Sequence, residues 1–112
     1  TNKTKMLSFL NNETRHFSLN LTQKLKDKES ITIGRAPFCN IIFPYPAISK
    51  EHARITRQGD DYFAEDLDSK YGTFVNGERL NSQKQKLKNN DELSLAEIKQ
   101  GDYALKLIFR IE

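Results

Sequence analysis

The clearest pattern in the sequence is Tyr103-Ala104-Leu105-Lys106-Leu107-Ile108-Phe109-Arg110-Ile111. Large apolar side chains take every second position from Tyr103 to Ile111, and the positions between them include Lys106 and Arg110. Successive side chains of a β-strand point to opposite faces, so a period of two gathers the apolar set on one face. The stretch therefore predicts a long core strand of an all-β domain.

The same period of two recurs along the chain, and no 3.6-residue period is sustained. We expect a hairpin of residues 4–10 and 16–22, a polar connection over 22–30, and a strand at 30–33. A brief apolar strand, compatible with burial on both faces, is expected at 40–43, and further strands at 53–56, 62–67 and around 93–95. Asn76-Gly77 predicts a tight hairpin turn within residues 74–80, because both residues tolerate positive φ. About ten short strands and no helix predict a β-sandwich.

Composition places limits on the setting of this domain. With 112 residues, a single domain over 1–112 is expected. The single cysteine, Cys39, favours an intracellular location, in the cytoplasm or nucleus. No apolar run reaches the roughly 20 residues of a membrane span, so no membrane association is expected. The sequence begins with Thr1 rather than Met, and we expect that it is excised from a longer protein.

Catalysis and metal binding are poorly supported by the residue pattern. Ser49 and His52 resemble a nucleophile and a base, but the strand pattern that follows puts His52 near a strand start. Residues three apart on a strand point to opposite faces, and no third group is evident to orient the imidazole. His16, His52 and Cys39 lack metal-ligand spacing. We therefore predict no enzyme activity, no metal and no cofactor.

Anion binding is better supported, because three loops carry compatible groups at strand ends. These loops contain Gly34-Arg35, Ser49-Lys50 and Ser69-Lys70. If the intervening strands run antiparallel, all three loops open at one end of the sandwich. A guanidinium, a hydroxyl and ammonium groups together suit a phosphate dianion. The formal charge of +3, with 18 basic and 15 acidic residues interspersed, leaves open that these groups are merely solvated surface charges.

Gly34-Arg35, Ser49-x-x-His52 and Tyr71-Gly72-Thr73-Phe74-Val75-Asn76-Gly77 together resemble the signature of forkhead-associated (FHA) domains. The resemblance extends from about Lys5 to Ile111. It implies a twisted sandwich of about eleven mostly antiparallel strands, with binding loops at one end. It also implies binding of phosphothreonine peptides without catalysis, a mode in which basic clusters read the phosphate.

The resemblance further implies a role for each matching residue. The residues expected to bind the phosphopeptide are Arg35, Ser49, Lys50, Lys70 and Tyr71. The residues expected to brace the loops are Gly34, His52, Gly72 and Asn76. The family commonly has asparagine at the position of Tyr71, where it bonds the peptide backbone. A phenol cannot reproduce the paired donor and acceptor of an amide, so we expect altered affinity but not loss.

The predicted function is a phosphothreonine-dependent interaction module that binds a threonine-phosphorylated signalling partner. The loop 44–48 is expected to favour an apolar third residue after the phosphothreonine. A second interpretation is a phosphate-independent docking or dimerising sandwich, in which Arg35 and Ser49 only shape the loops. A third is a nucleic-acid-binding domain that stacks bases on Phe38 and Tyr45. Basic and aromatic residues do not interleave along any strand, so no nucleic-acid partner is expected.

Overall fold

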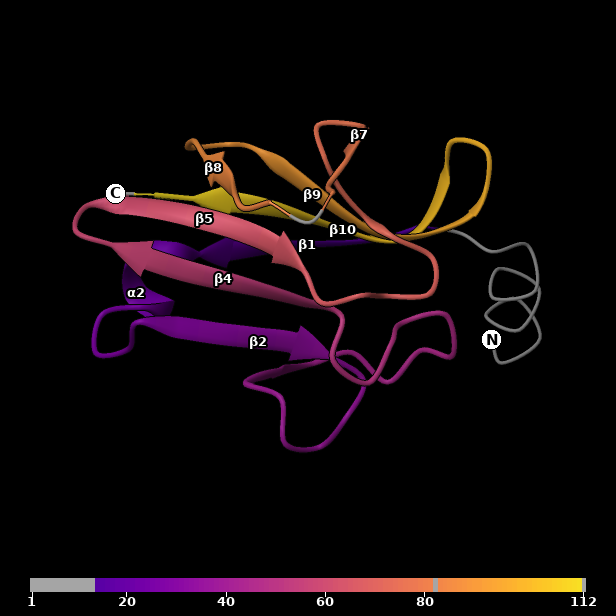
Figure 1. The fold of residues 1–112 in the computed structure, drawn as a ribbon, viewed down its shortest axis with the longest axis horizontal. Coiled ribbons are helices and arrows are strands. Elements are labelled where there is room, and N and C mark those ends of the chain that lie inside the picture. Colours follow the sequence, from indigo (N-terminus) through magenta and orange to yellow (C-terminus); the bar gives the residue numbers. More distant parts are fainter. Residues whose placement is uncertain (1–13, 82, 112) are drawn as a thin grey trace, which may run out of the picture.

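The protein is a sandwich of two five-stranded sheets in the computed structural model, which describes residues 14–81 and 83–111 (Figure 1). The first sheet has the order β1 (Arg15–Asn20), β10 (Asp102–Arg110), β9 (Glu92–Lys99), β6 (Thr73–Val75) and β7 (Glu78–Arg79). The second has the order β3 (Ile41–Ile42), β2 (Ser30–Gly34), β4 (Ala53–Gln58), β5 (Asp61–Asp66) and β8 (Gln85–Leu87). The predicted β-sandwich is confirmed.

Pairing within the sheets is mostly antiparallel. Among the described residues, β1 with β10 and β2 with β3 are the parallel pairs, and every other strand pair is antiparallel. β4 lies between β2 and β5. Ala53, at the start of β4, is the register partner of Ile33 on β2 and of Asp66 on β5. The end of β2, the start of β4 and the end of β5 therefore meet at one end of the second sheet.

The stretch 103–111 forms the core strand that its alternation predicts. Leu105, Leu107 and Phe109 of β10 are completely buried, while Arg110 is exposed. These side chains pack with buried residues of both sheets, including Ile33 and Ile55. Complete burial of each large apolar side chain contributes about 1.5–3 kcal/mol relative to exposure. The core thus fixes how the two sheets stack.

A one-turn helix, α2 (Leu21–Lys24), follows β1, so the predictions of no helix and of a strand reaching residue 22 are wrong. Asn20 caps this helix, because its side-chain oxygen accepts a hydrogen bond from Gln23 N at 3.0 Å. The turn sends Leu21 and Leu25, four residues apart, into the core, where both are completely buried. The helical turn brings side chains four residues apart to within about 5–6 Å of one another, whereas an extended strand would separate them by about 13 Å.

Burial at one edge also differs from expectation. Ile42 on β3 is 46% exposed while its neighbour Ile41 packs against the core, so only one face of β3 is covered and the predicted burial of both faces is wrong. Phe17 on β1 is 41% exposed and packs against Phe43, with 5.2 Å between ring centroids. The expected strand at 4–10 lies outside the described residues. No helix of the described residues is long and apolar enough to cross a membrane.

The Asn76-Gly77 turn joins β6 to β7 as predicted. Asn76 has φ of 50° and Gly77 has φ of 85°, the two positive values that a type I′ turn requires. Strand β8 was not anticipated. Its sequence, Gln85-Lys86-Leu87, supplies one apolar side chain and is too short to show alternation.

The core role of β10 gives a direct stability test. We expect Leu107→Ala to lower the free energy of unfolding by about 2–5 kcal/mol, because it removes buried methyl groups and leaves a cavity. Urea unfolding at fixed pH measures this change. Ile98→Ala, on the exposed part of β9, is the matched control and should change stability by less than about 1 kcal/mol. Equal effects of the two substitutions would contradict the assigned facing of β10.

Candidate functional site

Three loops gather at the end of the sandwich where β2 and β5 end and β4 begins (Figure 1). They are residues 35–40 after β2, 43–52 before β4 and 67–72 after β5. This is the shared end that the sequence predicted for the three anion-compatible groups. Hydrogen bonds of backbone and side chains join the loops to one another.

Arg35 is held by its backbone and by one guanidinium nitrogen. Its N–H donates to Ser49 O at 3.0 Å, and its Nε donates to Ile48 O at 2.9 Å. The residue is exposed, and within the described chain its terminal Nη groups have no hydrogen-bond or ion-pair partner. The anchored Nε orients the planar fork, so the Nη groups can face an anion bidentately.

Gly34 allows the loop carrying Ser49 to approach the end of β2. A Cβ built on Gly34 would lie 2.2 Å from Lys50 O and 2.9 Å from Cys39 Sγ. Lys50 O also accepts hydrogen bonds from Ala36 N at 3.1 Å and from the Cys39 thiol at 3.1 Å. Because the nearest clash is with backbone, any side chain at residue 34 would displace the 48–50 segment.

Ser49 and Lys70 join the second and third loops. Lys70 N donates to Ser49 Oγ at 3.1 Å, which leaves the hydroxyl hydrogen of Ser49 to donate outward. Lys50 and Lys70 are exposed, and neither ammonium group takes part in an ion pair among the described residues. Contacts between the loops thus join Arg35, Ser49 and Lys70, with Lys50 next to Ser49 in the chain, and none of the three charged side chains has an ion-pair partner among the described residues.

His52 connects the same two loops from below and is completely buried. Its Nδ1 accepts a hydrogen bond from Ser49 N at 3.0 Å, and its Nε2 donates to Gly72 O at 2.8 Å. These partners require a neutral ring with its proton on Nε2. Burial lowers the pKa of His52 below its usual 6.5, and this outweighs the opposite influences of the Gly72 carbonyl and the Asp66 carboxylate.

The same geometry argues against serine–histidine catalysis. The ring nitrogen that would accept a proton from Ser49 already accepts the backbone N–H of that residue, and the hydroxyl instead meets Lys70 N. Among residues 14–81 and 83–111, no cluster of three His, Cys, Asp or Glu side chains is arranged to hold a metal ion.

A carboxylate that the sequence analysis missed shapes the third loop. Asp66 Oδ1 accepts hydrogen bonds from Ser69 Oγ and, at 2.6 Å, from Thr73 Oγ1, while its Oδ2 accepts from Ser69 N at 3.1 Å. Ser69 Oγ in turn accepts from Gly72 N at 3.0 Å. The Asp-x-x-Ser spacing was the available signal, since short acidic side chains cap turns by bonding nearby backbone.

Gly72 and Tyr71 link this loop to β9. Gly72 adopts φ of 87°, and its carbonyl accepts Ala96 N at 2.9 Å as well as the His52 ring. Tyr71 O accepts Glu97 N at 3.0 Å. The Tyr71 side chain is 38% exposed, with Lys70 Nζ 5.3 Å from its ring centroid. The ring therefore stands at the surface beside the predicted phosphate ligands.

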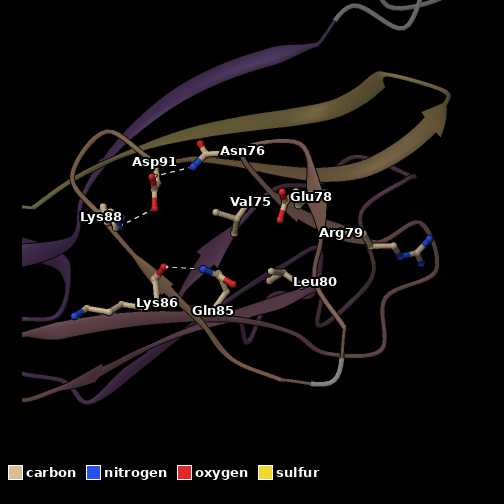
Figure 2. A pocket seen from close by; sticks show the side chains of 9 residues that line it. All are labelled: Val75, Asn76, Glu78, Arg79, Leu80, Gln85, Lys86, Lys88 and Asp91. Carbon is tan, nitrogen blue, oxygen red and sulfur yellow. Dashed lines mark hydrogen bonds between the residues drawn. The ribbon is translucent and has the colours of Figure 1, made fainter.

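Asn76 forms its side-chain hydrogen bonds away from the loops of Ser49 and Lys70. Its Nδ2 donates to Asp91 Oδ1 at 3.0 Å, and its Oδ1 accepts from Glu92 N at 3.0 Å. It thereby ties the β6–β7 turn to the segment before β9, beside an open pocket of about 230 Å³ (Figure 2). No predicted phosphate-binding residue lines that pocket.

The apolar residues ahead of Ser49 are mostly occupied by packing. Ile48 is completely buried and cannot contact a ligand. Tyr45 stacks on Phe43, at 6.4 Å between centroids, and carries the Arg15 guanidinium 4.1 Å from its own ring. Of the two aromatics considered for base stacking, Phe38 is the exposed one, at 70%. Ile48 therefore cannot be the contact that favours an apolar third residue after the phosphothreonine.

Comparison with known protein families gives an independent result. The family model of the FHA domain matches residues 31–96. The probable serine/threonine-protein kinase fhkA of Dictyostelium discoideum is 37% identical, over 80% of this chain and 16% of the kinase. The oxoglutarate dehydrogenase inhibitor of Corynebacterium jeikeium is 36% identical, over 67% of this chain and 51% of the inhibitor. The chain spans about half of the inhibitor and a much smaller share of the kinase.

Solved structures agree with the family match. One similar structure is the N-terminal FHA domain of Rad53p from S. cerevisiae in complex with a phosphothreonine peptide. It has a TM-score of 0.59 and 26% identity, covering 75% of this chain and 73% of that chain. Another, from a study of phosphothreonine-dependent FHA domain interactions, has a TM-score of 0.56 and 30% identity. It covers 60% of this chain and 68% of its own.

The buried His52 predicts a pH dependence of stability. Folding lowers the pKa of His52, so His52 of the unfolded chain binds a proton more tightly than His52 of the folded chain. As pH falls below about 6.5, the unfolded chain takes up this proton first. The contribution of the neutral ring is therefore complete above pH 6.5 and decreases as pH falls toward the lower pKa of the folded state. We expect urea unfolding between pH 7.5 and 5.5 to show this loss, with a slope of at most about 1.4 kcal/mol per pH unit.

The matched control is His52→Gln, which cannot titrate but offers one acceptor and one donor. His16 remains in both proteins, so only the difference between their pH profiles reports on His52. Parallel profiles would show that His52 is not the group whose protonation destabilises the fold.

Proposed function

The chain belongs to the FHA domain family, and we propose that it is a non-catalytic module that binds threonine-phosphorylated segments of a signalling protein. The observation that carries this proposal is the hydrogen bond from Lys70 N to Ser49 Oγ beside the anchored Arg35. Together these two contacts join the three loops, and the Arg35 Nη groups and the Ser49 hydroxyl hydrogen keep donor capacity for an anion. Such an arrangement matches the three acceptor oxygens of a phosphate.

Electrostatics favours the phosphorylated over the unmodified ligand. Phosphorylation adds nearly two negative charges at neutral pH. The Arg35 guanidinium and the Ser49 hydroxyl are each held by a hydrogen bond before the ligand arrives. Each charge-assisted hydrogen bond contributes about 1.5–3 kcal/mol. Because no carboxylate pairs with Arg35, Lys50 or Lys70 among the described residues, binding need not first break an internal ion pair.

The similar proteins support this proposal. The Rad53p FHA domain is described with a phosphothreonine peptide, and another neighbour with phosphothreonine-dependent FHA interactions. Since the chain spans only part of the kinase and the inhibitor, we infer that it is one domain of a longer protein. The free thiol of buried Cys39 supports an intracellular setting.

Tyr71 distinguishes this site within the proposed function. It has no amide to pair with a peptide backbone, and its carbonyl is already bonded to Glu97 N. We infer that the phosphate contacts from Arg35, Ser49 and the lysines supply most of the affinity. The ring of Tyr71 then offers a flat apolar contact beside the phosphothreonine.

The proposal is tested by titrating the domain with a library of threonine-phosphorylated peptides and its unphosphorylated twin. We expect binding to the phosphorylated library alone. Arg35→Ala and Ser49→Ala should each weaken it about tenfold to a hundredfold, as the loss of one charge-assisted hydrogen bond predicts. Lys28→Ala, at the other end of β2, is the control and should bind like the unaltered domain. Thermal unfolding shows whether each variant is folded.

Equal binding to both libraries would overturn the proposal and favour phosphate-independent docking. Tight binding to mixed oligonucleotides with a steep salt dependence would instead favour the nucleic-acid interpretation.

A further inference from the structure

Arg79 places another guanidinium against the loop that carries Lys70 and Tyr71. It belongs to β7, the edge of the first sheet, and it lines the same open pocket as Glu78 and Val75, but its guanidinium points away from the other side chains drawn there (Figure 2). A Cβ built on Gly72 would lie 3.1 Å from both Cζ and Nε of Arg79. The guanidinium therefore lies directly over the 70–72 turn.

The position of this side chain is fixed by aromatic packing. Arg79 is the cross-strand partner of Phe74, and its Cζ lies 5.8 Å from the centre of the Phe74 ring. Phe74 is only 5% exposed and packs edge-on against Tyr103, with centroids 5.0 Å apart. A cation held over a buried ring keeps its charge while its conformational freedom is reduced.

The charge of Arg79 is also not neutralised within the described residues. The ion pairs there join Arg54 to Glu65, Lys86 to Asp61, Lys99 to Asp102 and Lys106 to Glu92. Glu78, the adjacent residue, points to the opposite side of β7, as strand alternation requires (Figure 2). Arg79 is exposed, so an external anion can reach it.

We propose that Arg79 is a specificity-determining residue that selects ligands with a second anionic group beside the phosphothreonine. This inference rests on the proposed function. Gly72 is two residues from Lys70, and consecutive Cα atoms are about 3.8 Å apart, so their Cα atoms lie within about 8 Å. An extended ligand advances about 3.3 Å per residue, which brings a side chain one to three residues from the phosphothreonine over Arg79.

The ligand group that fits Arg79 is a carboxylate or a second phosphate. Both match the planar fork of a guanidinium. An arginine that merely covered Phe74 would need only its apolar stem and its stacking, and it would not distinguish acidic from neutral ligands. The preference for charge at one ligand position therefore separates the two roles.

The experiment uses phosphothreonine peptides with an alanine background and one aspartate or phosphoserine placed in turn at each of three positions on either side. We expect aspartate at one or two of these positions to raise the affinity of the unaltered domain about fivefold, the range of an exposed ion pair. Arg79→Gln should abolish this preference, and Arg79→Glu should reverse it. Arg79→Gln keeps a long polar side chain, so the test survives if the charge reversal prevents folding.

Lys28→Glu is the control for Arg79→Glu, since the two substitutions change the net charge by the same amount. Lys28 lies just before β2, at the end of that strand opposite the three loops. It should leave the positional preference intact. A preference that appears only with phosphoserine, and that depends on Arg79, identifies the second anion as a phosphate. Equal affinity for all positions of the acidic residue, or a preference that is unchanged in the Arg79 variants, would overturn the inference. The proposed function would still hold as long as the domain binds only phosphorylated peptides. Loss of phosphate dependence in the unaltered domain would remove both.

Discussion

The arrangement of the site depends on the two hydrogen bonds of one buried, neutral imidazole. His52 accepts from the backbone of Ser49 and donates to the carbonyl of Gly72, so a single ring sets the spacing of two loops. Without it, Ser49 N would lose its hydrogen-bond acceptor in a partly buried position, which costs about 1–3 kcal/mol. The ring performs this task only while it is uncharged, because protonated Nδ1 cannot accept.

Internal supports of this kind leave the outward groups available. Gly34 brings the loop of Ser49 against the end of β2, and Asp66 folds the loop of Lys70 through the hydroxyls of Ser69 and Thr73. The Asp66 carboxylate is thus directed at hydroxyls and backbone, and it forms no ion pair with Arg35 or Lys70.

Sequence reasoning succeeded where a pattern extends over many residues. The alternation of 103–111 and the positive-φ turn at Asn76-Gly77 both have local causes, and the structure shows them as expected. The shared end of the three loops followed from antiparallel pairing. The helix at Leu21 was missed because one capping hydrogen bond from Asn20 nucleates a turn too short to show a period.

Other features depend on contacts that sequence spacing does not contain. The exposure of Ile42 follows from the core covering only the Ile41 face of β3, and the partners of Asn76 follow from where residues 91–92 return to the hairpin. Arg79 belongs to this group as well. The sequence shows it only as one residue of the β6–β7 hairpin, and cross-strand pairing with Phe74 brings its guanidinium to Gly72.

The distribution of charge shows how a nearly balanced chain presents several unpaired basic side chains beside the same loops. Its 18 basic and 15 acidic residues give a net charge of only +3, so the whole molecule exerts little attraction. The paired charges on the strands, such as Arg54 with Glu65, cancel one another locally. Arg35, Lys50, Lys70 and Arg79 have no such partners among the described residues and adjoin the same loops. Net charge is therefore a poor guide to the anion-binding surface proposed for these loops.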